Sequence, residues 1–125
     1  DTTHVNEYAK ALFTNGLIAQ YTLNYCKANR QSLKEYQTYE ELVTYMDRQP
    51  MLEGLISFAK RKDITPNGNE LAESREVLTR SIYSNIIYHM LGMMEHIKFV
   101  NLKDSTVLKA VEILESGKAF PEIEG

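Results

Sequence analysis

The longest apolar pattern in the chain runs from Leu71 to Met94 and repeats with the period of an α-helix. Its apolar positions are Leu71, Val77, Leu78, Ile82, Ile86, Ile87, Met90, Leu91, Met93 and Met94. This stripe covers more than half of the helical circumference, which is typical of a helix packed by neighbours on several sides. The pattern therefore predicts a long central helix, roughly residues 70–92, that organises the rest of the chain.

Apolar residues at three- and four-residue steps predict a first helix over residues 5–29, with Thr2 or Thr3 as its N-cap. Gly16 falls within the apolar stripe of this helix. A glycine inside a helix costs about 1 kcal/mol relative to alanine. We interpret Gly16 as a point where another helix crosses close to the backbone, with a tolerated defect or kink as the alternative.

Two shorter helices follow a polar connection at residues 27–36. Thr38 and Glu41 form a capping box, in which each side chain accepts a hydrogen bond from a free backbone N–H, and they predict a helix start. Pro50 ends that helix and can occupy the first position of the next one. The next helix ends in the cationic residues 60–62, where positive charge complements the helix dipole.

The sequence signals that mark helix ends are clear before the central helix and weak after it. Residues 63–69 contain turn-forming residues, and Asn69 is the expected N-cap of the central helix. Gly92 ends or interrupts that helix, and residues 93–103 carry no clear signal. The pattern predicts a last helix that begins after Asp104 or Ser105 and has Val107, Leu108, Val111 and Leu114 on its buried face and Gly117 as its terminator. The prediction is all-α: a compact helical bundle of about five helices around a long central helix.

Composition narrows the class of protein. The 125 residues predict one domain, residues 1–125, with 43% hydrophobic and 25% charged residues and a net charge of −3. This balance is unlike that of a nucleic-acid-binding protein, and no apolar run reaches the length of a membrane span. The polar start without methionine indicates a mature fragment or an excised domain. Cys26 is the single cysteine, so no disulfide can form within the chain.

A metal site is the first candidate chemistry. His89 and His96 are seven residues apart, and with Met90, Met93, Met94 and Glu95 nearby they suggest a set of soft ligands. However, no His-x-x-x-His pair or Cys–His spacing accompanies them, and methionines at helical spacing are typical of core packing. We therefore predict no metal and no cofactor.

The other reactive side chains have structural interpretations. Cys26 lies in a helical pattern without a flanking signature, which favours a buried thiol over a nucleophile. The acidic residues 40–41, Glu70 and Glu73 occupy capping or surface positions. No second basic cluster or stacking aromatic joins residues 60–62, and the eight tyrosines are expected to be half-buried with their hydroxyls in water. We predict no catalytic residue in this chain.

Several short motifs follow one another in a recognisable order. They are Leu12-Phe13-x-x-Gly16-Leu17-x-x-Gln20-Tyr21, Leu52-x-x-Leu55-x-x-Phe58-Ala59, Ile64-x-Pro66, Ser74-x-x-x-Leu78, Ile82-x-x-Asn85-Ile86 and Val107-x-Lys109-Ala110-x-Glu112-x-Leu114. In this order they resemble the C-terminal helical region of bacterial carboxy-terminal processing (tail-specific) serine peptidases, Bacteroidetes type. Ser84 and residues 93–101 depart from that family's pattern.

The resemblance implies a function for the parent protein rather than for this chain. In that family a serine nucleophile and a lysine base lie in the protease core, and a PDZ module helps to bind substrate tails. Neither module is present here, so the resemblance implies a non-catalytic C-terminal domain in the periplasm or cell envelope. Its expected role is to pack on or regulate the protease core and PDZ module, or to mediate self-association as a homo-oligomer. The alternative is a free-standing helical interaction or dimerisation module, such as the ligand domain of a regulator.

Overall fold

The computed structural model describes the backbone of residues 5–108 and the side chains of residues 5–101. The described residues form seven α-helices and no strand, which confirms the all-α prediction with more helices than expected. The helices are α1 (Glu7–Thr14), α2 (Leu17–Ala28), α3 (Arg30–Leu33), α4 (Tyr39–Asp47), α5 (Met51–Lys60), α6 (Glu70–Leu91) and α7 (Met93–Leu108). Among these residues, no helix has both the length and the apolar character that a membrane crossing requires.

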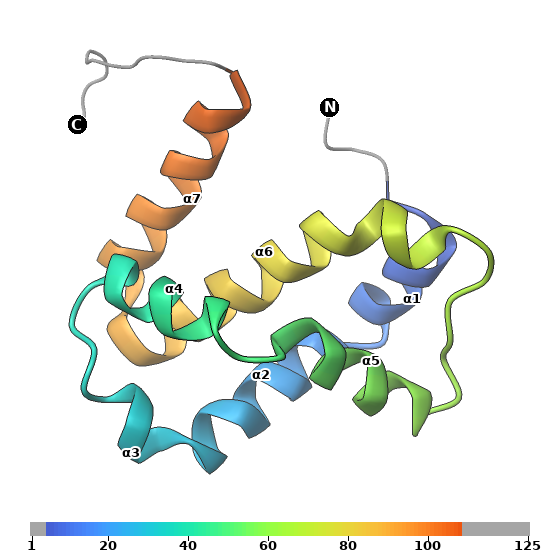
Figure 1. The fold of residues 1–125 in the computed structure, drawn as a ribbon, viewed down its shortest axis with the longest axis horizontal. Helices are drawn as coiled ribbons and strands as arrows, with labels where there is room; N and C mark the ends of the chain where they lie inside the picture. Colours follow the sequence, from blue (N-terminus) through green and yellow to red (C-terminus); the bar gives the residue numbers. More distant parts are fainter. Residues whose placement is uncertain (1–4, 109–125) are drawn as a thin grey trace.

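The central helix is α6, as the apolar stripe predicts. It crosses the molecule in Figure 1 and contacts α1, α2, α4, α5 and α7. Leu78, Ile82 and Ile86 are completely buried beneath these neighbours. The end of the stripe is different, because Met93 and Met94 belong to α7 and are 53% and 70% exposed. The prediction that methionines at this spacing fill the core is therefore wrong for these two residues.

The predicted first helix is divided into α1 and α2. Gly16 adopts the left-handed conformation, with φ of 69°, and a residue in that conformation cannot continue a right-handed helix. A Cβ added at Gly16 would have no atom within 4 Å, so the predicted close crossing at this glycine is wrong. The N-cap of α1 is Asn6, not Thr2 or Thr3, because Asn6 Oδ1 accepts a hydrogen bond from Ala9 N–H at 3.0 Å.

The close crossing of helices occurs at Gly54 of α5 instead. A Cβ added at Gly54 would collide with the hydroxyl and the ring of Tyr21, which belongs to α2. The same Tyr21 hydroxyl donates a hydrogen bond of 2.9 Å to the Met51 carbonyl. Glycine therefore allows α2 and α5 to approach, and the tyrosine hydroxyl fills the space over its backbone.

The capping box at the start of α4 is confirmed in a modified form. The Thr38 hydroxyl accepts a hydrogen bond of 3.2 Å from Glu41 N–H, as the motif predicts. The Glu41 carboxylate accepts from Gln37 N–H at 2.8 Å, one residue before the expected donor. Pro50 occupies the N-cap of α5, one position before the predicted one. The polar connection at residues 27–36 contains the additional short helix α3.

The boundaries of α6 agree with the prediction, but its N-cap does not use the expected bond. Asn69 holds the N-cap position without a side-chain capping bond, and the Glu70 carboxylate accepts from Asn67 N–H at 2.9 Å. At the other end, Gly92 has φ of 94°, so it ends α6 in a conformation that favours glycine.

The chain resumes as a helix directly after Gly92. Since α7 spans Met93–Leu108, Asp104 and Ser105 lie inside a helix, and the prediction that either residue starts the last helix is wrong. The predicted buried positions Val111 and Leu114 and the terminator Gly117 lie outside the described residues. α7 leaves the end of α6 at an angle and contacts α4 as well as α6 (Figure 1).

Candidate functional site

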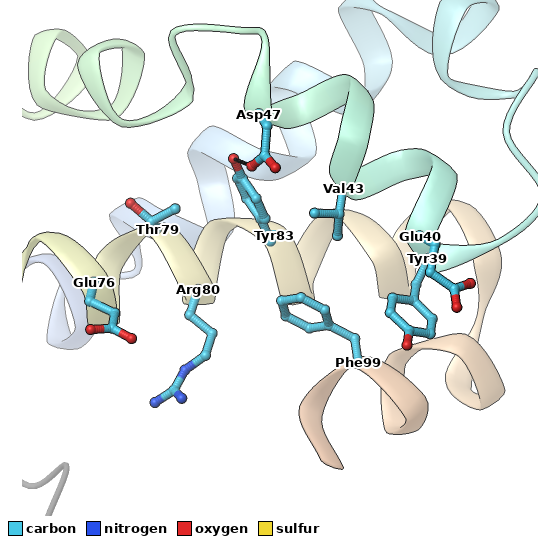
Figure 2. Close-up of a pocket in the computed structure, with 9 residues that line it drawn as sticks. All are labelled: Tyr39, Glu40, Val43, Asp47, Glu76, Thr79, Arg80, Tyr83 and Phe99. Carbon is cyan, nitrogen blue, oxygen red and sulfur yellow. Dashed lines mark hydrogen bonds between the residues drawn. The ribbon is translucent and has the colours of Figure 1, made fainter. Parts of the chain in front are cut away.

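A groove opens between α4, α6 and α7 and has a volume of about 490 Å³ (Figure 2). We call it the α4–α6–α7 groove. It is lined by Tyr39, Glu40, Val43, Asp47, Glu76, Thr79, Arg80, Tyr83 and Phe99. Because these residues come from three distant segments of the chain, the groove exists only when α7 is packed on α4.

A carboxylate from α7 holds the start of α4 at one end of this groove. Glu95 Oε1 accepts a hydrogen bond of 2.8 Å from the backbone N–H of Tyr39, the first residue of α4. Its second oxygen lies 3.0 Å from the Lys98 ammonium. The Tyr39 N–H, followed by Lys98, lowers the pKa of the Glu95 carboxyl because both favour its charged form. Glu95 thus acts as an N-cap supplied from another helix.

The floor of the groove is apolar and aromatic. Phe99 is 4% exposed, and its ring meets the ring of Tyr39 edge-on at a centroid distance of 6.1 Å. Tyr83 lies beside them, and its hydroxyl donates a hydrogen bond of 2.7 Å to Asp47 Oδ1 (Figure 2). Burial, and then the Asp47 carboxylate, raises the pKa of Tyr83, so its hydroxyl stays protonated at neutral pH.

Charged side chains form the rim of the groove. Glu40 and Asp47 extend from α4, and Glu76 and Arg80 extend from α6 (Figure 2). None of these four forms an ion pair with another of the residues whose side chains are described. The arrangement offers an apolar floor for a ligand or a partner side chain and a charged rim for its polar groups. Neither histidine nor cysteine lines this groove, so its described lining provides no nucleophile–base pair of those residue types.

Replacing Glu95 with glutamine is expected to destabilise the protein by at most about 1 kcal/mol at neutral pH, because the amide oxygen can still accept from Tyr39 N–H but the charge that strengthens this bond is lost. The folded pKa of Glu95 lies below its usual value of 4.5, so the carboxylate stabilises the fold above that value. This contribution disappears as the pH falls through the lowered pKa of the folded protein. Urea unfolding at neutral and acidic pH should therefore show a stability difference for Glu95→Gln that vanishes in acid. Glu76→Gln, which alters an exposed carboxylate on α6, should show little difference at either pH.

The histidines and methionines of the candidate metal site do not form a ligand set. Gly92 places His89 and His96 on different helices, and both rings lie against Tyr88, at 6.0 and 5.6 Å between centroids. His96 Nδ1 donates a hydrogen bond of 3.1 Å to the Ser84 carbonyl. Within the described part of the chain, no group of three His, Cys, Asp or Glu side chains could hold a metal ion.

Cys26 is buried, as the sequence predicts, at 5% exposure. It shares a hollow with His89, although no hydrogen bond joins the two side chains. Burial raises the pKa of the Cys26 thiol to about 11, even though the neighbouring Arg30 lowers it. The thiol is therefore neutral near pH 7, and it lacks the thiolate that nucleophilic chemistry needs.

Several tyrosine hydroxyls are tied to protein rather than to water, which corrects the sequence-based prediction. Tyr21 donates to the Met51 carbonyl, and the hydroxyls of Tyr25 and Tyr45 lie 3.1 Å apart. The Tyr8 hydroxyl is buried and has no hydrogen-bond partner among the described residues. The hydroxyls of these tyrosines therefore lie within the bundle, where they bond to other protein groups or are buried.

The cationic residues at the end of α5 do have an aromatic neighbour, so the prediction that no aromatic joins them is wrong. The Phe58 ring lies beneath Arg61 and Lys62, at 5.9 Å and 5.5 Å from their charged groups. A second basic group also exists, which the sequence pattern did not reveal. It is formed across α2, α3 and α6 by Lys27, Arg30, Lys34 and His89.

An apolar surface at the junction of α6 and α7 was also not predicted. Its members are Tyr88, Met93, Met94 and Ile97, which are 44% to 70% exposed. We call them the corner cluster. They lie on both sides of the turn at Gly92, across which the Tyr88 ring contacts the His96 ring of α7 at a centroid distance of 5.6 Å. The periodic stripe assigned Met93 and Met94 to the core because it did not include this turn.

The model of a family of unknown function (DUF8443) matches residues 8–92, which is more than half of the chain. The chain belongs to this family. No curated protein and no solved structure matches it.

The DUF8443 match begins in α1 and ends at Gly92, at the end of α6. It contains all the residues that line the hollow shared by Cys26 and His89. Phe99 and most of the corner cluster lie beyond it. The α4–α6–α7 groove combines two helices of the DUF8443 region with α7, which follows that region.

Proposed function

We propose that this chain is a non-catalytic helical domain that docks on another protein module. The resemblance to carboxy-terminal processing peptidases makes the protease core of the same polypeptide, in the cell envelope, the proposed partner. In this role the domain packs on the core and regulates access to it, and it contributes no catalytic residue. The single observation that carries the proposal is the corner cluster.

The corner cluster has the composition of an interface. Of the large apolar side chains that are exposed among the described residues, four gather at this junction: Tyr88, Met93, Met94 and Ile97. Full burial of an exposed apolar side chain contributes about 1.5–3 kcal/mol, and these four side chains, which are 44% to 70% exposed, would each contribute roughly half of that on docking. Contiguous exposed apolar surface marks interaction sites, and methionine adapts to irregular partner surfaces. Glu95 and the buried Phe99 fix the first turns of α7, so this surface is held in place before docking.

The test is a cross-linking experiment in the full-length parent protein. A photo-reactive amino acid at Met94 should cross-link to the protease core within the same chain. The matched control carries the same group at Lys10, an exposed residue on α1, away from the α6–α7 junction, and should not cross-link there. Met94→Glu and Ile97→Glu together should release the domain, which faster limited proteolysis between core and domain would report.

Different outcomes separate the two functional hypotheses. Cross-links between two copies of this chain, with none to a core, would replace the proposal with a free-standing dimerisation module. A parent gene without a serine–lysine protease core before Asp1 would refute the peptidase assignment directly. Equal cross-linking from Met94 and Lys10 would remove the corner cluster as the docking surface.

The non-catalytic part of the proposal has its own measurement. The purified chain should hydrolyse no peptide substrate. Reproducible hydrolysis that is lost when a residue of this chain is substituted would show that the domain itself is an enzyme.

A further inference from the structure

A second hollow in the bundle concentrates positive charge. α2, α3 and the end of α6 surround a cavity of about 320 Å³. It is lined by Leu23, Cys26, Lys27, Arg30, Lys34, His89 and Met90. Three of these side chains are cationic, and no Asp or Glu lines the cavity. This arrangement is unusual in a chain whose net charge is −3.

Among the described side chains, no carboxylate forms an ion pair with the cations of this hollow. The ion pair found among residues 5–101 joins Glu95 to Lys98, so Lys27, Arg30 and Lys34 have no carboxylate partner there. Lys27 lies at the end of α2, and Arg30 and Lys34 lie four residues apart at the two ends of α3, where like charges at this spacing destabilise a helix. A bound anion would remove this repulsion.

The base of the hollow is apolar and neutral. Cys26 is 5% exposed and keeps its proton at neutral pH because burial raises its pKa to about 11. Leu23 and Met90 supply apolar surface beside it. A suitable ligand combines an anionic group with a small apolar body.

We propose that this hollow binds a small phosphate monoester, with the phosphate held by Arg30, Lys27 and Lys34 and the organic part resting on Leu23 and Met90. Three cations match a dianion better than a singly charged carboxylate. The arginine guanidinium can donate two parallel hydrogen bonds to phosphate oxygens. The volume lies at the small end of the range for ligand pockets, about 300–1,000 Å³, which suits a ligand with a single ring. A nucleic acid would need an extended basic stripe instead.

The experiment uses phenyl phosphate as the probe and isothermal calorimetry of the whole chain as the measurement. The wild-type protein should bind it in a saturable one-to-one manner and more tightly than inorganic phosphate, which lacks the apolar ring. Arg30→Gln should weaken binding about tenfold or more, as the loss of a charge-assisted bidentate contact predicts. Arg61→Gln makes the same change in the other basic cluster, beside Phe58, and should leave binding unchanged.

The outcomes identify the ligand chemistry and its source. Equal weakening by Arg30→Gln and Arg61→Gln would show diffuse attraction and overturn the proposal, as would benzoate binding as tightly as phenyl phosphate. Binding to phosphatidylcholine vesicles that contain phosphatidic acid, if lost in Arg30→Gln, would identify a lipid headgroup as the source of the phosphate monoester. Arg30 is exposed, so its substitution should preserve the fold, which circular dichroism of the variant checks.

Discussion

Replacing Gly54 with alanine is expected to lower the free energy of unfolding by about 2 kcal/mol, the middle of the range for overpacking a helix crossing. The added Cβ collides with the hydroxyl and ring of Tyr21, so α2 and α5 must separate or the tyrosine must rotate away. Rotation breaks the 2.9 Å hydrogen bond from Tyr21 to the Met51 carbonyl, at a further cost of about 1 kcal/mol. The better helix propensity of alanine, about 1 kcal/mol, offsets only part of this loss. Urea unfolding measures the change as a lower midpoint at an unchanged slope.

A double-mutant cycle with Tyr21→Phe tests the mechanism. Phenylalanine lacks the hydroxyl that the new Cβ would strike, although a ring carbon still lies at 3.0 Å from the Cβ position. Gly54→Ala should therefore cost about 1 kcal/mol less in the Tyr21→Phe background than in the wild type, because residues in direct contact are not additive. If Gly54→Ala instead stabilises the protein, as at an open helical position, α2 and α5 do not cross closely here.

Local sequence signals predicted the features that depend on a few neighbouring residues. The capping box at Thr38 and Glu41 and the end of α6 at Gly92 are both short-range events, and both are confirmed. The long apolar stripe of α6 was readable because its apolar residues recur at helical spacing along the 22 residues of the helix. What these signals share is that their physical cause lies within one or two helical turns.

Features that join distant segments were not readable in the same way. Gly16 and Gly54 both interrupt helical patterns, but only the fold shows that Tyr21 lies over Gly54 while Gly16 has open space. The cap that Glu95 supplies to Tyr39 spans 56 residues and has no sequence signature. Helical periodicity also cannot show a turn that lets a new helix begin at once, so α7 was missed.

The two candidate sites also join distant segments, so local sequence signals did not predict them. The α4–α6–α7 groove and the basic hollow each gather residues from three helices, and no single segment contains a recognisable motif for either. Composition pointed away from a nucleic-acid-binding protein, because the whole chain is acidic, and it gave no sign of a local basic site. Net charge averages over the surface, whereas binding depends on the charges that surround one cavity.

Substituting Phe99 with alanine should detach α7 while the rest of the bundle stays folded. Phe99 is 4% exposed and packs on Tyr39, so it joins α7 to α4 and closes the α4–α6–α7 groove. Removing a buried phenylalanine costs about 3–5 kcal/mol. The first turns of α7 have few other anchors of this kind, since Met93, Met94 and Ile97 face solvent. We therefore expect the loss to appear as local opening rather than as global unfolding.

Amide hydrogen exchange distinguishes these two responses. Protection in residues 93–101 should fall by at least about a hundredfold, since 1.4 kcal/mol corresponds to a factor of ten, while the amides of α2 and α6 keep most of theirs. Ile97→Ala removes an apolar side chain from the same helix at a position that is 44% exposed, and it should change protection little. A uniform loss of protection across α2, α6 and α7 would mean that α7 belongs to a single cooperative unit with the bundle. A selective loss would mean that one aromatic contact controls both the groove and the placement of the corner cluster, because α7 carries most of that cluster.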